Sequence, residues 1–201
     1  MTILVLATDI QWEEMQLLVN DQWHRVVDEA AFFAGKADIY INLLEDSINK
    51  DYSKMPEPVL VNATCTTLHS MQAPSHVGRL NGWPGFLNRS TWELAVSTAS
   101  LFEKFFRENK ITPLYVADEP GLVSAKVIAM IVNEAYFALA EGVSTKAEID
   151  IAMKLGTNYP FGPFEWSEKI GVHKIASLLL KLSETDSRYT ACPLLLKESN
   201  L

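Results

Sequence analysis

No glycine precedes Gly35 in this sequence. A dinucleotide-binding turn needs several glycines directly after the first buried strand, because the backbone must approach a pyrophosphate closely. Here the apolar run 3–7 is followed by residues 8–12, which include Asp9 but no glycine. The carboxylate of Asp9 would also repel that anion. The spaced-glycine pattern of such turns occurs nowhere in the chain, so we predict that no dinucleotide cofactor binds in the usual way.

Basic side chains are also scarce. The chain has 17 Lys and Arg against 25 Asp and Glu, a net charge of −8, which argues against nucleic acid and anionic membranes as partners. The two cysteines, Cys65 and Cys192, have no metal-ligand or redox spacing and indicate a reducing compartment. No apolar run approaches the ~18–20 residues of a membrane helix. The start of the chain lacks the basic region of a signal peptide, and we expect a cytoplasmic protein.

The four histidines do not form a metal site by their spacing. They are His24, His69, His76 and His173, and none has a metal-type neighbour four residues away. We interpret them as surface or cap residues. His69 and His76, on either side of a short loop, are the pair to examine first as acid–base candidates.

Strands and helices alternate in the first half of the chain, which predicts a largely parallel α/β sheet. We expect strands at 3–7, 25–27, 37–44, 58–62 and 111–117, with an edge-like strand at 77–83. Helices are expected around Trp12 to Val19 and at 29–34, the latter closed by Gly35. A longer helix is predicted over 91–109, with Ser90 as its N-cap and Glu93 at the capping-box position.

The second half is predicted to be all helical, so we place the domain boundary near Asp118, giving domains 1–117 and 118–201. Residues 121–141 are apolar nearly all round, which is typical of a helix buried by its own domain or by a second subunit. Further helices are expected from Ser144 or Thr145 to Gly156, from Pro163 to near Gly171, and at 175–182 and 193–199.

Two stretches carry candidate binding residues. Asn62, Thr64 and Thr66 follow a buried strand, and the carboxyl ends of parallel strands are where open α/β sheets bind ligands. Their polar groups could hold a substrate oxygen, although threonines capping a connection explain the same pattern. Tyr159 and Phe161 lie on a turn made rigid by prolines and are read either as binding residues or as core and interface residues.

Several motifs of the second half agree in order and spacing with the C-terminal domain of 3-hydroxyacyl-CoA dehydrogenases. They are residues 118–123, 133–135, 141–144, 149–156, 159–165, 188–189 and 193–195. The chain resembles that family over roughly residues 115–199. The first half resembles the family's nucleotide-binding domain only in fragments, at 37–41 and 58–62. The resemblance therefore implies a shortened Rossmann-like domain followed by the helical domain, which in this family forms a homodimer.

The same resemblance implies where the family's site residues fall. Its substrate-binding serine falls on Thr66, or on Thr64 in the other alignment, and both keep a hydroxyl. Its catalytic histidine falls on Asn81, or on Leu80, and neither is a base. The glutamate that orients this histidine falls on Glu93.

The family's catalytic asparagine falls on Ala125. In the family, the histidine takes the proton of the substrate hydroxyl while a hydride goes to NAD. Removal of such a base costs about 10²–10⁴-fold in rate. The resemblance thus implies a protein without the family's mechanism and without its NAD site.

Three hypotheses follow. The first is a catalytically impaired relative, in acyl-CoA metabolism, that binds an acyl-CoA-type ligand. The second is an active NAD-dependent oxidoreductase whose missing groups come from elsewhere, such as His76 or a second subunit. The third is a non-catalytic dimerisation or interaction module, with the apolar helix 121–141 as its homodimer face. We expect a homodimer in each case.

Overall fold

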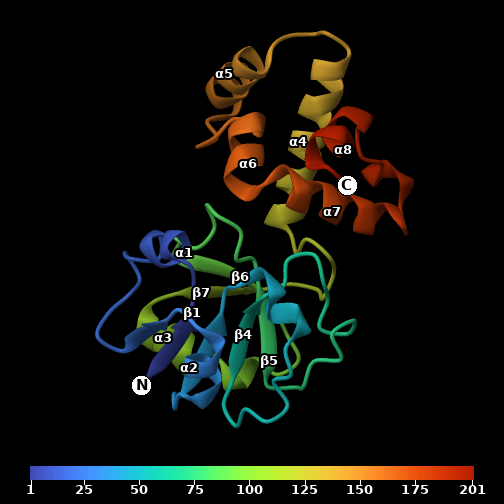
Figure 1. Ribbon diagram of the computed structural model, residues 1–201. Coiled ribbons are helices and arrows are strands. Elements are labelled where there is room, and N and C mark those ends of the chain that lie inside the picture. Colours follow the sequence, from blue (N-terminus) through green and yellow to red (C-terminus); the bar gives the residue numbers. More distant parts are fainter. The chain divides into compact units, whose positions relative to one another are not determined.

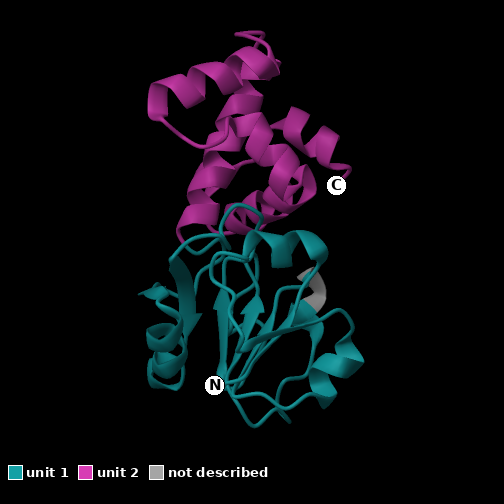
Figure 2. Cartoon of the chain, turned by 90° about the vertical axis from the view of Figure 1, so that its left-hand side faces the viewer, with its two compact units in different colours: residues 1–122 teal, residues 123–201 magenta. Residues whose placement is uncertain are grey.

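The computed structural model describes all 201 residues except the side chains at positions 45 and 46. Its contacts divide the chain into two compact units, residues 1–122 and 123–201 (Figure 2). We expected the boundary near Asp118, and the units meet a few residues later, just before the first long helix. Each unit is described separately below.

Unit 1 is built on one seven-stranded sheet (Figure 1). Its strands are β1 (Ile3–Leu6), β2 (Trp23–Val26), β3 (Ile39–Asn42), β4 (Val59–Asn62), β5 (Val77–Leu80), β6 (Thr91–Val96) and β7 (Thr112–Tyr115). The spatial order is β2-β1-β3-β4-β5-β6-β7. Strands β1 to β5 pair in parallel, whereas β6 runs antiparallel to β5 and β7 parallel to β6. The predicted class, a mostly parallel α/β sheet followed by a helical region, is confirmed.

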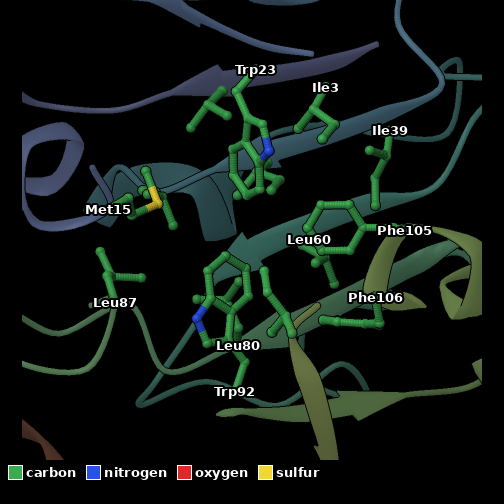
Figure 3. Packing of buried hydrophobic residues seen from close by; sticks show 14 of the residues in the cluster. Ile3, Met15, Trp23, Ile39, Leu60, Leu80, Leu87, Trp92, Phe105 and Phe106 are labelled. Carbon is green, nitrogen blue, oxygen red and sulfur yellow. The ribbon is translucent and has the colours of Figure 1, made fainter. Parts of the chain in front are cut away.

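Helices and loops cover both faces of this sheet, as the buried strands require. Helices α1 (Asp9–Glu14), α2 (Glu29–Ala34) and α3 (Glu103–Asn109), with the short η1 (Glu45–Asn49) and η2 (Ala99–Leu101), complete the unit. One face packs against α3 through the rings of Trp23, Trp92 and Phe105, with Trp23 centred 5.6 Å from Phe105 (Figure 3). The other face packs against Phe32 of α2 and Tyr52.

The helix predicted over 91–109 is wrong in its first part. Residues Thr91–Val96 form strand β6, and only Glu103–Asn109 is an α-helix. Along the first four residues of β6, the exposed Thr91 and half-buried Glu93 alternate with the buried Trp92 and Leu94. This period of two marks a strand. Pairing with two neighbouring strands outweighs the helical spacing of the apolar residues that follow. Ser90 is therefore not a helix cap, and Glu93 is a strand residue.

Two further details of unit 1 differ from prediction. The strand expected to be edge-like at 77–83 is β5, which lies inside the sheet between β4 and β6, and the edges are β2 and β7. The helix expected to reach Val19 ends at Glu14. Met15 is nevertheless buried in the core, because the turn that follows the helix packs on the sheet.

Unit 2 consists of helices α4 (Ser124–Ala140), α5 (Lys146–Thr157), α6 (Pro163–Ile170), α7 (Val172–Ser183) and α8 (Pro193–Ser199), with η3 (Ser187–Tyr189) before the last. The capping box of Thr145 and Glu148 and the first-turn Pro163 are confirmed. The α5 helix continues through Gly156 and ends with Asn158 in the left-handed conformation. The prediction of its end at Gly156 is wrong, because the amide side chain of asparagine tolerates that conformation.

Helix α4 is buried on one face rather than all round. Ala125, Ala129 and Val132 are buried, whereas Val123 and Val127 are 48% and 47% exposed within this chain. The side chain of Asn133 forms hydrogen bonds with the segment before α8. Its amide group donates to the Thr190 carbonyl at 3.0 Å and accepts from the Cys192 N–H at 2.8 Å. Throughout the described chain, no helix combines the length and apolar character of a membrane span.

Candidate ligand site at the ends of strands β4 and β5

Asn62 closes β4 and joins three segments at the carboxyl edge of the sheet. Its side-chain N–H donates to the Leu43 carbonyl at 3.1 Å, and its side-chain oxygen accepts from the Gly82 N–H at 3.1 Å. A Cβ at position 82 would lie only 2.6 Å from the Asn62 side chain, so this approach requires glycine. The Asn62 amide is 7% exposed. Its position is therefore fixed from both sides.

The hydroxyl of Thr64 lies between two amide oxygens. It is 3.3 Å from the side-chain oxygen of Asn62 and 3.5 Å from that of Asn81, and all three residues are buried. The Asn81 oxygen also accepts from the Trp83 N–H at 3.2 Å. One hydroxyl proton can serve only one of the two oxygens at a time, and both distances are long for an O–H donor. The Thr64 hydroxyl is thus poorly satisfied and could form a stronger hydrogen bond with a ligand oxygen.

Glu93 lies across the ladder from Asn81. The antiparallel register pairs Leu80 with Leu94, so the next position along places Asn81 opposite Glu93. Glu93 is half-buried and pairs on its other side with Leu114 of β7. The two residues that the resemblance assigns to the family's dyad, with Leu80 as the alternative to Asn81, are therefore neighbours. An amide can bind and orient a ligand, but it cannot accept a proton as imidazole does.

The remaining residues predicted for the site lie on other segments, each described within its own unit. Thr66 is half-buried on the turn after β4. Tyr159 and Phe161 belong to unit 2, on the turn before α6, where the Phe161 ring packs edge-on against Trp166 at 4.9 Å. Ala125 is fully buried on α4, and its methyl group has no hydrogen-bonding capacity. Within unit 1, the structure brings together Asn62, Thr64, Asn81 and Glu93.

The turn between β1 and α1 does not fit a dinucleotide. It lies next to the β1–β3 switch point, where such ligands bind in open α/β sheets. Thr8 and Gln11 form a reciprocal capping box there, so side chains already satisfy the backbone N–H groups that would meet a pyrophosphate.

The side chain of Gln11 also fills this switch point. Its N–H donates to the Leu43 carbonyl at 2.7 Å, across the gap between β1 and β3. The Asp9 carboxylate also lies beside the turn, where it forms an ion pair with Arg25 at 2.7 Å. We conclude that the residues present do not fit NAD.

The two histidines are held by different contacts. The His76 ring nitrogen Nε2 lies 3.1 Å from the Tyr52 carbonyl oxygen, so it carries the proton and donates. His69 is exposed, and its backbone N–H donates to Asp118. In the part of the chain whose side chains are described, His, Cys, Asp and Glu form no group of three that could hold a metal ion.

Sequence reasoning missed one buried polar cluster beside this site. Arg79, in the middle of β5, is fully buried and forms an ion pair with Asp118, with Nε 2.6 Å from Oδ1. A charged residue within a buried strand was the available signal, because such a charge needs a partner.

The comparisons with known proteins bear mainly on unit 2. The 3-hydroxyacyl-CoA dehydrogenase C-terminal domain matches residues 121–199. The chain is similar to a 3-hydroxyadipyl-CoA dehydrogenase of Escherichia coli, at 41% identity over 45% of this chain and 20% of that protein. It is also similar to a 3-hydroxybutyryl-CoA dehydrogenase of Clostridioides difficile, at 38% identity over 51% of this chain and 37% of that protein. The chain thus spans well under half the length of these relatives.

Solved structures extend the likeness to the sheet. A 3-hydroxybutyryl-CoA dehydrogenase from Escherichia coli is 30% identical with a TM-score of 0.59, covering 70% of this chain and 31% of that one. The (S)-3-hydroxybutyryl-CoA dehydrogenase of Ralstonia eutropha covers 88% of this chain and 69% of that one, with a TM-score of 0.67 and 20% identity. At that identity the second likeness concerns the fold alone, and it includes the Rossmann-like arrangement of unit 1.

Proposed function

Because the chain belongs to the 3-hydroxyacyl-CoA dehydrogenase family through residues 121–199, we propose that it binds an acyl-CoA-type thioester without transferring a hydride. The observation that carries this proposal is the Thr64 hydroxyl between the amide oxygens of Asn62 and Asn81. A polar site for a ligand oxygen is retained there, while the position of the family's proton acceptor holds an amide.

Three differences support the loss of the family's reaction. Asn81 cannot take the proton of a substrate hydroxyl. Ala125 has no polar group where the family has an amide. The Thr8–Gln11 capping box occupies the turn that would have to cradle a pyrophosphate. Restoring any one of these would leave the other two, so the impairment does not depend on a single residue.

The ligand class follows from the names of the relatives and from the site. The relatives above are dehydrogenases of 3-hydroxyadipyl-CoA and 3-hydroxybutyryl-CoA, so a thioester of coenzyme A is the ligand class we propose. Thr64 would donate its hydrogen bond to a carbonyl oxygen of the acyl group. Glu93, next to Asn81, would accept from a hydroxyl of the ligand.

The test combines turnover and binding. Purified protein is mixed with NADH and acetoacetyl-CoA, and NADH absorbance is followed. In parallel, melting temperatures are measured with NAD, NADH, CoA and acetoacetyl-CoA, because a ligand that binds only the native state raises the melting temperature. We expect a rise with acetoacetyl-CoA, none with NAD or NADH, and no NADH consumption. Robust NADH-dependent turnover would overturn the proposal.

We also propose a homodimer through unit 2. Two apolar side chains one turn apart on α5 face solvent within this chain, with Ile151 54% and Leu155 84% exposed. Exposed apolar side chains that lie together can mark an interaction site. In a twofold dimer, the same surface of each copy contacts its counterpart. Ile151 and Leu155 of one copy would therefore pack against Ile151 and Leu155 of the other.

A further inference from the structure

Arg79 holds two separate segments of unit 1 against the sheet. It lies on the face of β5 that also carries Val77, and it is fully buried. Its Nη1 donates to the Ala63 carbonyl at 3.0 Å, directly before Thr64, and its Nη2 donates to the Glu119 carbonyl. The planar guanidinium group has donors pointing in fixed directions. It therefore sets the distance between the turn after β4 and the segment after β7.

The Asp118 carboxylate binds both Arg79 and the end of the turn after β4. Its Oδ1 accepts from Arg79 Nε at 2.6 Å and from the Leu68 N–H at 3.1 Å, and its Oδ2 accepts from the His69 N–H at 3.1 Å. Burial alone would raise the pKa of Asp118. The hydrogen bonds from Leu68, Arg79 and His69 outweigh burial and hold that pKa below its usual value. The carboxylate is thus ionised and engaged on both oxygens.

A third contact closes the same arrangement. The Gly121 N–H donates to the Thr64 carbonyl at 2.7 Å. The turn 63–69 is consequently tied to residues 118–121 at its start, at Thr64, and at its end. Four hydrogen bonds of the turn form these ties: those of Ala63, Leu68 and His69 involve Arg79 or Asp118, and the fourth involves Thr64 itself. The hydroxyl of Thr64 faces Asn62 and Asn81.

We propose that Arg79 and Asp118 are positioning residues for ligand binding at Thr64. The pair does not reach the ligand, and it acts by fixing the turn that presents the Thr64 hydroxyl. This inference rests on the proposed thioester binding for its functional consequence, but the fixing of the turn can be measured without a ligand. Displacing a hydrogen-bonding group by even an ångström weakens the interaction it forms.

The test uses the full chain and the variants Asp118→Asn and Arg79→Lys. The first keeps an acceptor for one backbone N–H and loses the charge that pairs with Arg79. Arg79→Lys keeps the positive charge but loses the two guanidinium nitrogens that donate to the carbonyls of Ala63 and Glu119. Asp28→Asn is the matched control, because the Asp28 carboxylate also accepts from a backbone N–H in unit 1, that of Ala31 at 2.8 Å, outside this turn.

Two readouts are taken on each protein. Amide hydrogen exchange over residues 63–69 reports the turn itself, and titration with acetoacetyl-CoA reports binding. We expect both test variants to exchange these amides at least about tenfold faster and to bind acetoacetyl-CoA about tenfold more weakly. The Asp28→Asn control should match the wild type in both. The melting temperature identifies any variant that is unfolded, and the other variant then decides.

The outcomes separate this inference from the proposed function. Unchanged exchange over 63–69 in the folded variants overturns the positioning role. Faster exchange spread evenly over unit 1, with unchanged affinity, overturns it as well, because the pair would then serve only global stability. If the wild type does not bind acetoacetyl-CoA, the proposed function fails, and the exchange at 63–69 alone decides whether the pair fixes the turn.

Discussion

The side-chain oxygen of Asn81 lies 3.5 Å from the hydroxyl oxygen of Thr64, at the adjoining ends of β5 and β4. Both groups can form hydrogen bonds, and an amide does not accept a proton as an imidazole does. Under the proposed function, this site recognises a ligand oxygen and does not oxidise a hydroxyl.

Replacement of Thr64 tests this relationship. We expect Thr64→Ala to weaken acetoacetyl-CoA binding by roughly fivefold to thirtyfold, the equivalent of one hydrogen bond of about 1–2 kcal/mol. Thr64→Ser should bind nearly as well as the wild type, since it keeps the hydroxyl. Isothermal titration calorimetry measures each affinity.

Thr66→Ala is the matched control, because it removes the hydroxyl favoured by the other alignment. If Thr66→Ala lowers the affinity for acetoacetyl-CoA and Thr64→Ala does not, then the threonine hydroxyl that binds the ligand is that of Thr66.

The turn before α6 depends on one close approach between Gly162 and Asp150. A Cβ at position 162 would lie 2.3 Å from the Asp150 carboxylate, which itself accepts from the Phe164 and Glu165 N–H groups at 2.8 and 3.2 Å. We expect Gly162→Ala to lower the free energy of unfolding by about 1–3 kcal/mol, as overpacking does. Chemical denaturation followed by circular dichroism provides the measurement.

Gly156 offers the control for that substitution. It lies inside α5, and a Cβ there would meet nothing within 4 Å. Gly156→Ala should therefore raise stability, by up to ~1 kcal/mol, because alanine favours the helix. Equal effects at the two positions would show that the approach of Asp150 is not what requires glycine at 162.

The pH dependence of unit 1 follows from Asp118. Its pKa is lowered in the folded state, because hydrogen bonds from Leu68, Arg79 and His69 outweigh the opposing effect of burial. The unfolded state then binds protons more readily. The stability that Asp118 contributes is present above its unfolded-state pKa of about 3.9 and is lost as the pH falls through the folded-state value.

Hydrogen exchange measured from about pH 3 to about pH 7, after correction for intrinsic rates, checks this. Protection of residues 63–69 should fall in acid in the wild type and much less in Asp118→Asn. Burial raises the pKa of Asp150 in unit 2, which gives the opposite sign there. An acid-induced loss confined to α5 and α6 would contradict this account.

The proposed dimer depends on the exposed stripe of α5. Leu155→Asp should convert the protein to a monomer at micromolar concentration, because it places an unpaired charge within an apolar interface. Sedimentation velocity measures the state.

Leu17→Asp is the comparison, since Leu17 is 87% exposed in unit 1 and Leu155 is 84% exposed in unit 2. A wild-type protein that sediments as a monomer, or a dimer unaffected by Leu155→Asp, would rule out this interface.

Capping and turn residues predicted the ends of helices correctly wherever packing against the rest of the fold favoured the same structure. Helix α2 has the predicted bounds, because Asp28 caps it and Gly35 ends it. The Thr145 capping box and Pro163 likewise mark helix starts. In 91–96 the context prevailed instead: the spacing of the apolar residues that follow predicted a helix, but these residues form β6, because β5 and β7 flank them in the sheet.

The site was predictable only in part for the same reason. Asn62 and Thr64 follow a strand that is evident from the sequence, so their place at the carboxyl edge could be foreseen. The pairing of Asn81 with Glu93 depends on an antiparallel register that no local pattern specifies. The link between Arg79 and Asp118 joins positions 39 residues apart, and spacing gives no indication of it.

Calorimetric titration of the wild-type protein with acetoacetyl-CoA and, separately, with NADH tests the central claim most directly. The account predicts saturable binding of acetoacetyl-CoA that Thr64→Ala weakens, and no heat of binding for NADH. Saturable binding of NADH, with or without turnover, would contradict it, because the Thr8–Gln11 turn would then accommodate a dinucleotide after all.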